Sequence, residues 1–362
     1  MGDERFMRQA LKLAQSGLGN TSPNPLVGVV VVDPSGNVVG AGYHEKAGAD
    51  HAEVVALRQA GDRARGGTLY VTLEPCVHHG RTPPCVDAIK VAGISRVVSA
   101  LADPDPRVAG AGHTSLRDSG IEVSVGMEAD QATHANRMYL RHRTTGLPFV
   151  TLKMAQSLNG TIASRPGERR QLSGKRASNV VRKLRFEHDA VMVGVGTILI
   201  DDPQLTVRPF KPRAVPYTRV IVDAKGRIPM RARAIKDQAR FRTIVATTNQ
   251  MPGAVREGLI KRSVAVLECA RSENDRVDLG DLLSKLGSEN ILSVLCEGGP
   301  TLAGSLLAGR HLDELWWLIA PIVLNAEEAV PVVGNGAYDL ALHINAVKRL
   351  GDDVLVTARV KR

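Results

Sequence analysis

The first 146 residues alternate between apolar runs with strand spacing and segments with helical spacing. Residues 4–17 place their apolar side chains on one helical face. Residues 26–33 and 38–43 are rich in valine, and the Pro-Ser-Gly-Asn segment between them is typical of a turn, so this pattern predicts two strands. A second helix is predicted to open at Asp50, a suitable N-cap, which would place His51 in the first turn.

The alternation continues as far as residue 146. Residues 85–92 are predicted to form a short helix, with proline before it and glycine after it. Residues 126–146 are polar and basic with helical spacing, and we expect their charged side to face solvent, another domain or another subunit. Strands are predicted at residues 68–73, 96–101 and 122–125. Alternating strands and helices predict a mainly parallel sheet with helices on both faces.

The second half shows the same kind of pattern. A helix is predicted at residues 175–187, and an edge-like strand at residues 352–360 closes the chain. Buried strands are expected at residues 149–155, 189–194, 219–223, 243–247, 264–268, 291–296 and 315–320. Both halves are therefore of the α/β class. We predict two domains, residues 1–145 and 146–362, each of ordinary size for a chain of 362 residues.

Composition narrows the range of functions. Hydrophobic residues make up 43% of the chain and aromatic residues only 3%, which argues against stacking platforms for single-stranded nucleic acid. The formal net charge of +10 fits either an ordinary basic surface or the attraction of anionic ligands. No long basic block selects between phosphorylated small molecules and nucleic acid.

The cysteine content and the N-terminus bear on the cellular compartment. The four cysteines, at positions 76, 85, 269 and 296, are too few and too unevenly spaced for a disulfide framework. The N-terminus has no apolar signal core, and no run approaches the roughly 18 apolar residues that would span a membrane. We therefore expect a cytoplasmic protein without a membrane partner, whose thiols stay reduced.

One stretch carries several reactive side chains. His51 and Glu53 lie about two dozen residues before Cys76, and eight residues separate Cys76 from Cys85. One histidine and two cysteines supply three protein ligands for Zn²⁺ and leave a position for water, as in catalytic zinc sites. His-x-Glu followed by Pro-Cys and a later Cys is the signature of zinc deaminases that act on nucleobases. In the common form of that signature, two residues separate the cysteines.

These residue types predict a hydrolytic deamination. Zinc would lower the pKa of a bound water, and Glu53 would pass its proton to a ring nitrogen and to the departing amine. Two simpler interpretations compete with this one. A cysteine can be just a small buried apolar residue, or the zinc could be structural with His78 or His79 as a fourth ligand. The nearby Glu53 favours catalysis.

The second half contains a glycine-rich turn. Gly298 and Gly299 follow a predicted strand, and Pro300 begins a predicted helix. Free backbone N–H groups at such a helix start suit a phosphate. Gly194-x-Gly196 forms a second turn of this kind. Such turns are common without a ligand, and the complete Gly-x-Gly-x-x-Gly pattern is absent, so a nicotinamide cofactor would bind outside a standard Rossmann crossover.

Several stretches of the first half resemble the deaminase part of the bifunctional RibD family of riboflavin biosynthesis. The matching residues are 21–28, 42–48, 51–53 and 74–85. In that family, the spacing of the two cysteines found here is the normal form. The resemblance implies a cytidine-deaminase-like three-layer α/β/α domain, zinc on His51, Cys76 and Cys85, and Glu53 as the proton donor. It also implies substrate contacts from Asn24, His44 and His78.

The second half resembles the reductase part of the same family, an α/β domain similar to dihydrofolate reductase. The matching residues are 152–153, 157–160, 196–197, 201–208 and 297–305. The resemblance implies substrate contacts from Lys153, Arg185, Leu205, Arg208 and Glu297, of which the arginines suit a phosphate. It implies NADPH as the cofactor, contacted by Gln156, Thr197, Asp201, Gly299, Pro300, Thr301, Leu302, Ala303, Gly304 and Ser305.

Three positions depart from that family. Asn159 stands where the family usually has Asp, and Arg169 replaces a small Ser that contacts the substrate. Gln171 also differs from the usual residue. The contact made by the family Ser is therefore missing, and Arg169 and Arg170 are candidates to supply a phosphate partner instead.

The resemblance as a whole implies an enzyme with two activities. The first domain would deaminate 2,5-diamino-6-(5-phosphoribosylamino)pyrimidin-4-one, and the second would reduce the ribosyl group of 5-amino-6-(5-phosphoribosylamino)uracil to ribityl with NADPH. We expect a homo-oligomer that binds phosphorylated pyrimidines and no nucleic acid. The alternatives are a deaminase with a degenerate or regulatory reductase-like domain, a deaminase of free nucleobases or RNA, and a basic RNA-binding protein with structural zinc.

Overall fold

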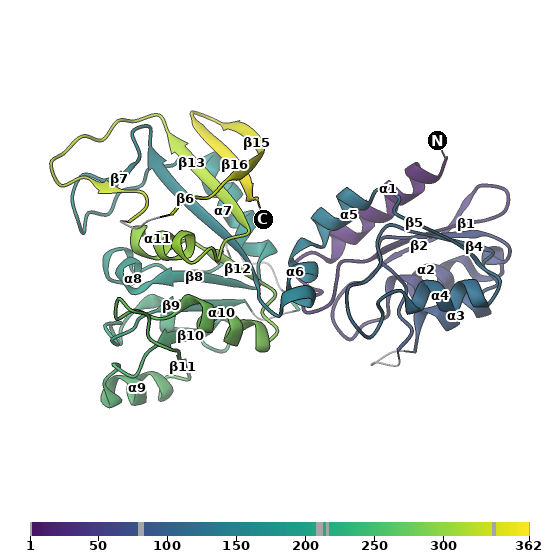
Figure 1. The fold of residues 1–362 in the computed structure, drawn as a ribbon, viewed down its shortest axis with the longest axis horizontal. Helices are drawn as coiled ribbons and strands as arrows, with labels where there is room; N and C mark the ends of the chain where they lie inside the picture. Colours follow the sequence, from purple (N-terminus) through teal and green to yellow (C-terminus); the bar gives the residue numbers. More distant parts are fainter. Residues whose placement is uncertain (1, 79–82, 208–212, 215–216, 335–337, 362) are drawn as a thin grey trace. The chain divides into compact units, whose positions relative to one another are not determined.

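The computed structural model describes residues 2–78, 83–207, 213–214, 217–334 and 338–361 (Figure 1). The chain divides into two compact units, Met1–Gly146 and Leu147–Arg362. Each unit has its own sheet and its own hydrophobic cores. Within the described residues, no helix combines the length and the apolar character needed to cross a bilayer.

The first unit is built on a five-stranded sheet in the order β2-β1-β3-β4-β5. Its strands are β1 (Gly28–Val32), β2 (Val38–Tyr43), β3 (Thr68–Val71), β4 (Arg96–Ser99) and β5 (Glu122–Val125). β1 pairs antiparallel with both β2 and β3, whereas β3, β4 and β5 run parallel. Four of the five strands therefore run in the same direction, as the prediction of a mainly parallel sheet requires, and β1 is the exception. Every residue of β1 is buried, because both faces of the sheet are covered.

Helices cover both faces of this sheet. They are α1 (Gly2–Ala14), α2 (Ala52–Ala60), α3 (Cys85–Val91), α4 (Ala111–Asp118), α5 (Ala129–Ala135) and α6 (Arg137–Thr145), with 3₁₀ turns at Gln15–Gly17 and Gly61–Ala64. Val29 and Val31 join the core under α2, and Val30 and Val32 join the core under α1. Because successive strand side chains point to opposite faces, β1 supplies both cores of a three-layer α/β/α arrangement.

Two helix predictions need correction. α2 begins at Ala52 with His51 as the residue before it, so Asp50 is not its N-cap. The Asp50 carboxylate instead pairs with Arg58 at 2.7 Å on the surface. Residues 126–146 contain two helices, α5 and α6, and not one. The two helices are separated at Asn136, whose side chain makes a buried hydrogen bond with the backbone of Leu26.

The second unit contains a nine-stranded sheet in the order β11-β10-β9-β8-β12-β6-β13-β16-β15. Its strands are β6 (Phe149–Ser157), β8 (Ala190–Gly194), β9 (Thr218–Val222), β10 (Arg242–Thr247), β11 (Ala265–Glu268), β12 (Ser293–Cys296), β13 (Glu314–Ala320), β15 (Leu342–Leu350) and β16 (Asp353–Val360). β7 (Thr161–Ala163) and β14 (Val330–Pro331) form a separate pair. The strands from β11 to β13 are parallel, and β16 and β15 continue antiparallel.

The expected edge strand at the end of the chain is not at the edge. β16 lies between β13 and β15, and β15 forms the edge. β15 was not predicted from the sequence, because nearly all of its residues are exposed and no buried face repeats along it.

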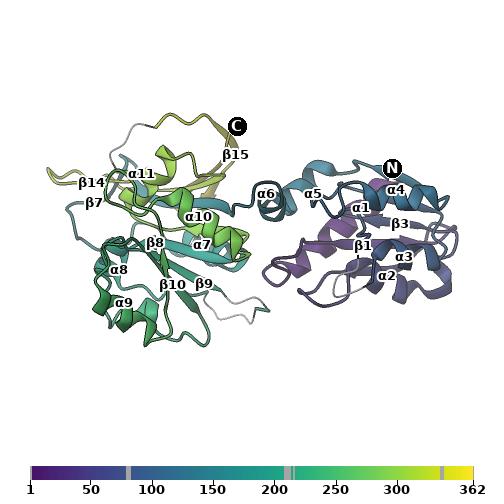
Figure 2. The ribbon, with the colours of Figure 1, turned by 60° about the horizontal axis from the view of Figure 1, so that its bottom comes forward.

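Helices cover both faces of the second sheet as well (Figure 2). They are α7 (Lys175–Glu187), α8 (Val195–Asp201), α9 (Gly253–Ile260), α10 (Leu279–Ser288) and α11 (Pro300–Ala308), with a 3₁₀ turn at Arg233–Ile235. α10 and α11 pack on one face, and α7, α8 and α9 pack on the other. The helices that begin directly after β8 and β12 place their N-termini beside the ends of these parallel strands, where ligands of α/β proteins commonly bind.

Candidate active sites

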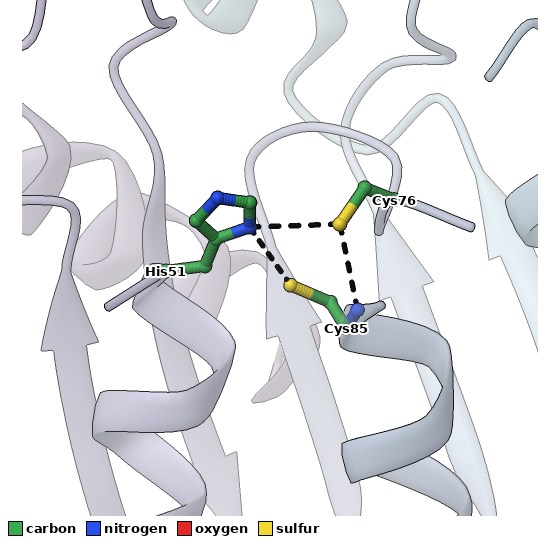
Figure 3. A group of neighbouring side chains, drawn as sticks. All are labelled: His51, Cys76 and Cys85. Atoms are coloured by element: carbon green, nitrogen blue, oxygen red, sulfur yellow. Dashed lines mark hydrogen bonds between the residues drawn. The ribbon is translucent and has the colours of Figure 1, made fainter. Parts of the chain in front are cut away.

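Three potential metal ligands meet in the first unit (Figure 3). His51 directly precedes α2, Cys76 follows β3, and Cys85 is the first residue of α3. The Nδ1 atom of His51 lies 3.1 Å from the Sγ atom of Cys85 and 3.5 Å from that of Cys76. The ligand atoms of all three residues lie within 4.8 Å of one another. The structure therefore brings together the three residues that the sequence predicts to bind zinc.

The chemistry of this cluster fits Zn²⁺. One imidazole nitrogen and two sulfurs are borderline-soft donors, and the cluster formed by the described residues supplies these three ligands and no fourth. A hydrogen bond with the Cys85 thiol lowers the pKa of the Cys76 thiol. Burial opposes this shift, and a hydrogen bond with the His51 imidazole lowers the pKa further. A thiol with a lowered pKa favours the thiolate form that a metal needs. His78 is not part of the cluster, and His79 lies outside the described residues.

Glu53 is placed to transfer protons at this cluster. It is the second residue of α2, and it lines a cavity of about 390 Å³ together with His51 and Cys76. Its side chain is almost completely buried. Burial, and after it the charge of Cys76, raises the pKa of Glu53 to about 7. A carboxyl group that titrates near neutrality can both accept and return a proton.

Asn24, His44 and His78 line the same cavity. Burial lowers the pKa of His44, so its imidazole is neutral and has one donor and one acceptor nitrogen. Its Nδ1 lies 3.1 Å from the carbonyl oxygen of Asp50 and therefore donates, which leaves Nε2 to accept from the Asn24 amide at 3.0 Å. The buried Nδ1 of His78 has no hydrogen-bond partner in the described part of the chain.

The structure adds lining residues that the sequence did not indicate. Asp103, Asp105, Arg107, Tyr139 and Arg143 all border this cavity. The Tyr139 hydroxyl donates to both carboxylate oxygens of Asp103 at 3.1 Å, and Arg107 binds Asp105 through two nitrogens. Tyr139 and Arg143 belong to the basic segment for which we expected a charged side facing solvent or another domain. No motif links them to the zinc ligands, so only the fold reveals their position.

A second cavity, of about 720 Å³, lies in the second unit along β6, at the ends of β8 and β9 and at the loop that follows β12. Many of the residues expected to contact substrate or cofactor line it, namely Lys153, Thr197, Asp201, Glu297, Gly299, Pro300, Thr301, Leu302 and Ser305. Gln156, Arg185, Ala303 and Gly304 are not among the residues that line this cavity. Leu205 is not among them either, because its side chain packs into the core. Arg208 lies outside the described residues.

Three charged side chains form the polar centre of this second site. The Arg185 guanidinium donates to the two carboxylate oxygens of Glu297 at 2.5 and 2.9 Å, and to the carbonyl oxygen of Thr206 at 3.2 Å. Lys153 lies on β6, whose neighbour β12 ends directly before Glu297. Burial lowers the pKa of Lys153, although the charge of Glu297 opposes this shift. An anion thus sits beside two cations in a largely buried position.

The glycines of this cavity leave room for a phosphate-bearing cofactor. A Cβ atom added at Gly194 or Gly196 would meet nothing within 4 Å, and one at Gly299 would meet only Thr197, at 3.9 Å. The backbone N–H groups at the start of α11 have no partner inside the helix, and they belong to residues that line the cavity. The site therefore fits a dinucleotide whose phosphates bind at a helix N-terminus.

The structure also shows the surroundings of the residues that depart from the family pattern, and of the neighbouring Arg170. The Asn159 side chain accepts from the Leu324 N–H at 3.0 Å and donates to the Leu324 carbonyl oxygen at 2.7 Å. Arg169 lies 3.5 Å from Asp201, with both side chains well exposed. Arg170 and Gln171 line the cavity, whereas Arg169 does not.

Comparisons with protein families agree with these two sites. Residues 1–101 match the cytidine and deoxycytidylate deaminase zinc-binding region, and residues 148–356 match the RibD C-terminal domain. Together with the zinc-ligand cluster, these matches define an enzyme that joins a zinc-binding deaminase domain to a reductase domain. A reductase domain of this family implies a nicotinamide cofactor.

Relatives match over nearly the whole chain. The riboflavin biosynthesis protein RibD of Aquifex aeolicus is 40% identical and covers 98% of this chain and 97% of its own length. The Escherichia coli RibD is also 40% identical, with 98% of each chain covered. The solved structure of Acinetobacter baumannii RibD has a TM-score of 0.89 and 37% identity over 100% of this chain and 99% of that chain.

A further solved structure is the diaminohydroxyphosphoribosylaminopyrimidine deaminase/5-amino-6-(5-phosphoribosylamino)uracil reductase of Thermotoga maritima. It has a TM-score of 0.86 and 32% identity, with 99% of each chain covered. The present chain belongs to the RibD family. It is a bifunctional deaminase/reductase of riboflavin biosynthesis.

Proposed function

We propose that the first unit deaminates 2,5-diamino-6-(5-phosphoribosylamino)pyrimidin-4-one. We propose that the second unit reduces the ribosyl group of 5-amino-6-(5-phosphoribosylamino)uracil to ribityl with NADPH. The name of the Thermotoga maritima relative contains both activities. The observation that carries the proposal is the buried Glu53 in one cavity with His51 and Cys76, which form a potential metal-binding cluster with Cys85. A nucleobase deaminase needs this combination.

In the deaminase reaction, a zinc ion held by His51, Cys76 and Cys85 would supply a Lewis acid that lowers the pKa of water toward neutrality. Glu53 accepts one proton of the attacking water and passes it to the ring nitrogen, and it then carries the second proton, from the new hydroxyl group, to the departing amine as the carbonyl forms. Asn24 and the neutral His44 orient the pyrimidine through hydrogen bonds, and His78 offers an Nδ1 that has no partner among the described residues. The products are a ring carbonyl and ammonia.

In the reductase reaction, a nicotinamide cofactor bound in the second cavity would supply a hydride for C1′ of the sugar. The bond between C1′ and the ring oxygen breaks, and that oxygen takes up a proton. Lys153, whose pKa burial lowers, is placed to deliver this proton, and Glu297 holds a sugar hydroxyl. Arg185 keeps the Glu297 carboxylate ionised and oriented through their two hydrogen bonds.

The preference for NADPH over NADH belongs to the same proposal. Arg227 and Arg276 line the cavity, and guanidinium groups bind phosphate through charge-assisted hydrogen bonds. They offer a counter-charge to the 2′-phosphate that distinguishes the two cofactors. Replacing both by Ala is expected to raise the KM for NADPH and to leave that for NADH unchanged. Equal changes for both cofactors would contradict this assignment.

Two separate assays test the proposed function. The first measures ammonia release from the diaminopyrimidine, and the second measures NADPH oxidation with the aminouracil as substrate. Activity in both assays supports the proposed pair of reactions. Activity in the first assay alone would favour a deaminase whose reductase-like domain is inactive. Deamination of nucleosides or RNA, with none of the diaminopyrimidine, would favour the nucleobase or RNA deaminase alternative.

We also propose that the chain forms a homo-oligomer through its second unit. The edge strand β15 exposes Ile344 and Val347 to 59% and 62%, and an exposed apolar edge strand is a ready surface for pairing with another chain. Sedimentation velocity of the wild type and of Val347→Lys tests this, since only the wild type should associate. The cytoplasmic location and the absence of nucleic-acid binding stay predictions.

A further inference from the structure

Asn136 links the end of α5 to a distant loop. It lies between α5 and α6, and only 2% of its surface is exposed. Its Oδ1 accepts from the Leu26 N–H at 2.8 Å, and its Nδ2 donates to the Leu26 carbonyl oxygen at 2.9 Å. The side-chain amide thus pairs with Leu26 as a residue of a neighbouring strand would, although 110 positions separate the two residues.

The loop that Asn136 holds contains two prolines, and Arg143 donates to the carbonyl oxygen of Pro23 at 3.5 Å. Pro23 and Pro25 flank Asn24, and proline has no N–H to donate. The Asn24 N–H bonds the Thr21 carbonyl oxygen at 2.8 Å, which closes a local turn but does not tie the loop to the rest of the unit. Both backbone groups of Leu26 are paired with Asn136. Asn136 therefore anchors the chain two residues after Asn24.

The anchored loop forms one wall of the deaminase cavity. Pro23, Asn24 and Pro25 all line it, as do His44 and Glu53. The Asn24 amide contacts His44 Nε2 at 3.0 Å, so a shift of the loop also changes what His44 presents to a ligand. A displacement of about 1 Å at a positioning group can lower a reaction rate by about 10²-fold.

We propose that Asn136 is a positioning residue of the deaminase, which sets Asn24 and through it His44 for contact with the pyrimidine. This inference rests on the proposed deaminase function. The role suits an amide, because Leu26 presents one donor and one acceptor, and a planar amide meets both at once with two separate atoms. A carboxylate at position 136 would face the Leu26 carbonyl oxygen with a second acceptor, and the unpaired groups would be buried.

The test compares Asn136→Asp and Asn136→Ser with the matched control Asn37→Ser in the full-length, zinc-loaded enzyme. Asn37 is exposed in the turn between β1 and β2, so the control makes the same chemical change away from the cavity. Ammonia release gives kcat and KM, and zinc content and NADPH oxidation are measured on the same preparations. We expect a rise in KM of about tenfold or more for both Asn136 variants, with zinc content, reductase activity and the control unchanged.

A double-mutant cycle separates positioning from a general loss of stability. If Asn136 acts through Asn24, adding Asn136→Ser to Asn24→Ala costs less than about twofold in KM, because the contact is already gone. Equal losses in both backgrounds, an unchanged KM in the Asn136 variants, or a parallel loss of zinc would overturn the proposal. A wild-type enzyme that releases no ammonia would instead contradict the proposed function, so the two failures are distinguishable.

Discussion

Arg185 in α7 and Glu297 after β12 form a bidentate ion pair, with nitrogen–oxygen distances of 2.5 and 2.9 Å. Their side chains are only 18% and 10% exposed. Removing one partner of such a pair leaves a largely buried charge without compensation, which costs more than the pair itself contributes to stability. The pair therefore links the stability of the second unit to the chemistry of its cavity.

Arg185→Lys keeps the positive charge but cannot reproduce the two parallel hydrogen bonds. Loss of charge-assisted bonds of this kind costs about 1.5–3 kcal/mol, so we expect the kcat/KM of the reductase to fall by about 10- to 100-fold. Ammonia release should not change. Arg182→Lys, on the exposed side of the same helix, is the matched control. Reductase activity retained within about twofold in Arg185→Lys would contradict the role given to this pair.

The same pair predicts a specific sensitivity to acid. Burial alone would raise the pKa of Glu297, but Arg185 and then Lys153 lower it below its ordinary value of 4.5. A carboxyl group with a lowered pKa in the folded state stabilises the protein above its unfolded pKa, and this contribution is lost as the pH falls through the folded pKa. The difference in unfolding free energy between the wild type and Glu297→Gln should therefore be constant above about pH 6 and shrink below about pH 4.5. Denaturant unfolding at a series of pH values measures it, and a difference that grows toward acid would be inconsistent with this pair.

Removal of zinc should affect the two activities differently. Chelation is expected to abolish ammonia release, because His51, Cys76 and Cys85 lie in the first unit only. NADPH oxidation with the aminouracil should persist. Zinc added back should restore deamination, whereas Mg²⁺ should not, since it prefers oxygen ligands. Loss of both activities on chelation, followed by recovery of both with zinc, would argue against separate sites.

Asn159 offers a test of an unusual residue. Its amide pairs with both backbone groups of Leu324, and Asp at this position could accept from the N–H but could not donate to the carbonyl oxygen. Asn159→Asp should therefore lower the unfolding free energy of the second unit by about 1–2 kcal/mol. Asn290→Asp, at an exposed position in the same unit, is the control. Equal stability of both variants in denaturant titrations would show that the donated bond contributes nothing.

The zinc cluster could be predicted from sequence because its chemistry is carried by two short motifs. His51 and Glu53 are two positions apart, and the cysteines flank one loop, so residue type and spacing were enough. The contact between Asn136 and Leu26 could not be predicted, since it joins residues 110 positions apart through a side chain with no recognisable pattern. The roles of Asn24, His44 and His78 stay predictions, although all three line the cavity.

Most strands of the fold could also be predicted from the sequence. Buried valine-rich runs indicated most strands of both sheets, because burial leaves a clear pattern in the sequence. The antiparallel pairing of β1 with β2 follows from the short turn predicted between them, since parallel strands need a longer connection. The antiparallel pairing of β1 with β3 was not predictable, because no short turn joins these two strands and every residue of β1 is buried. The exposed β15 was missed for the opposite reason, as it has no buried face.

We infer that this chain carries two active sites that work independently of each other. The most direct test measures ammonia release and NADPH oxidation, each with its own substrate, for Glu53→Gln and Lys153→Ala. Glu53→Gln should lose about 10²- to 10⁴-fold in ammonia release, as expected for a lost acid–base group, and keep NADPH oxidation. Lys153→Ala should show the reverse. If either variant abolishes both activities, or if the wild type does not oxidise NADPH, the claim is contradicted.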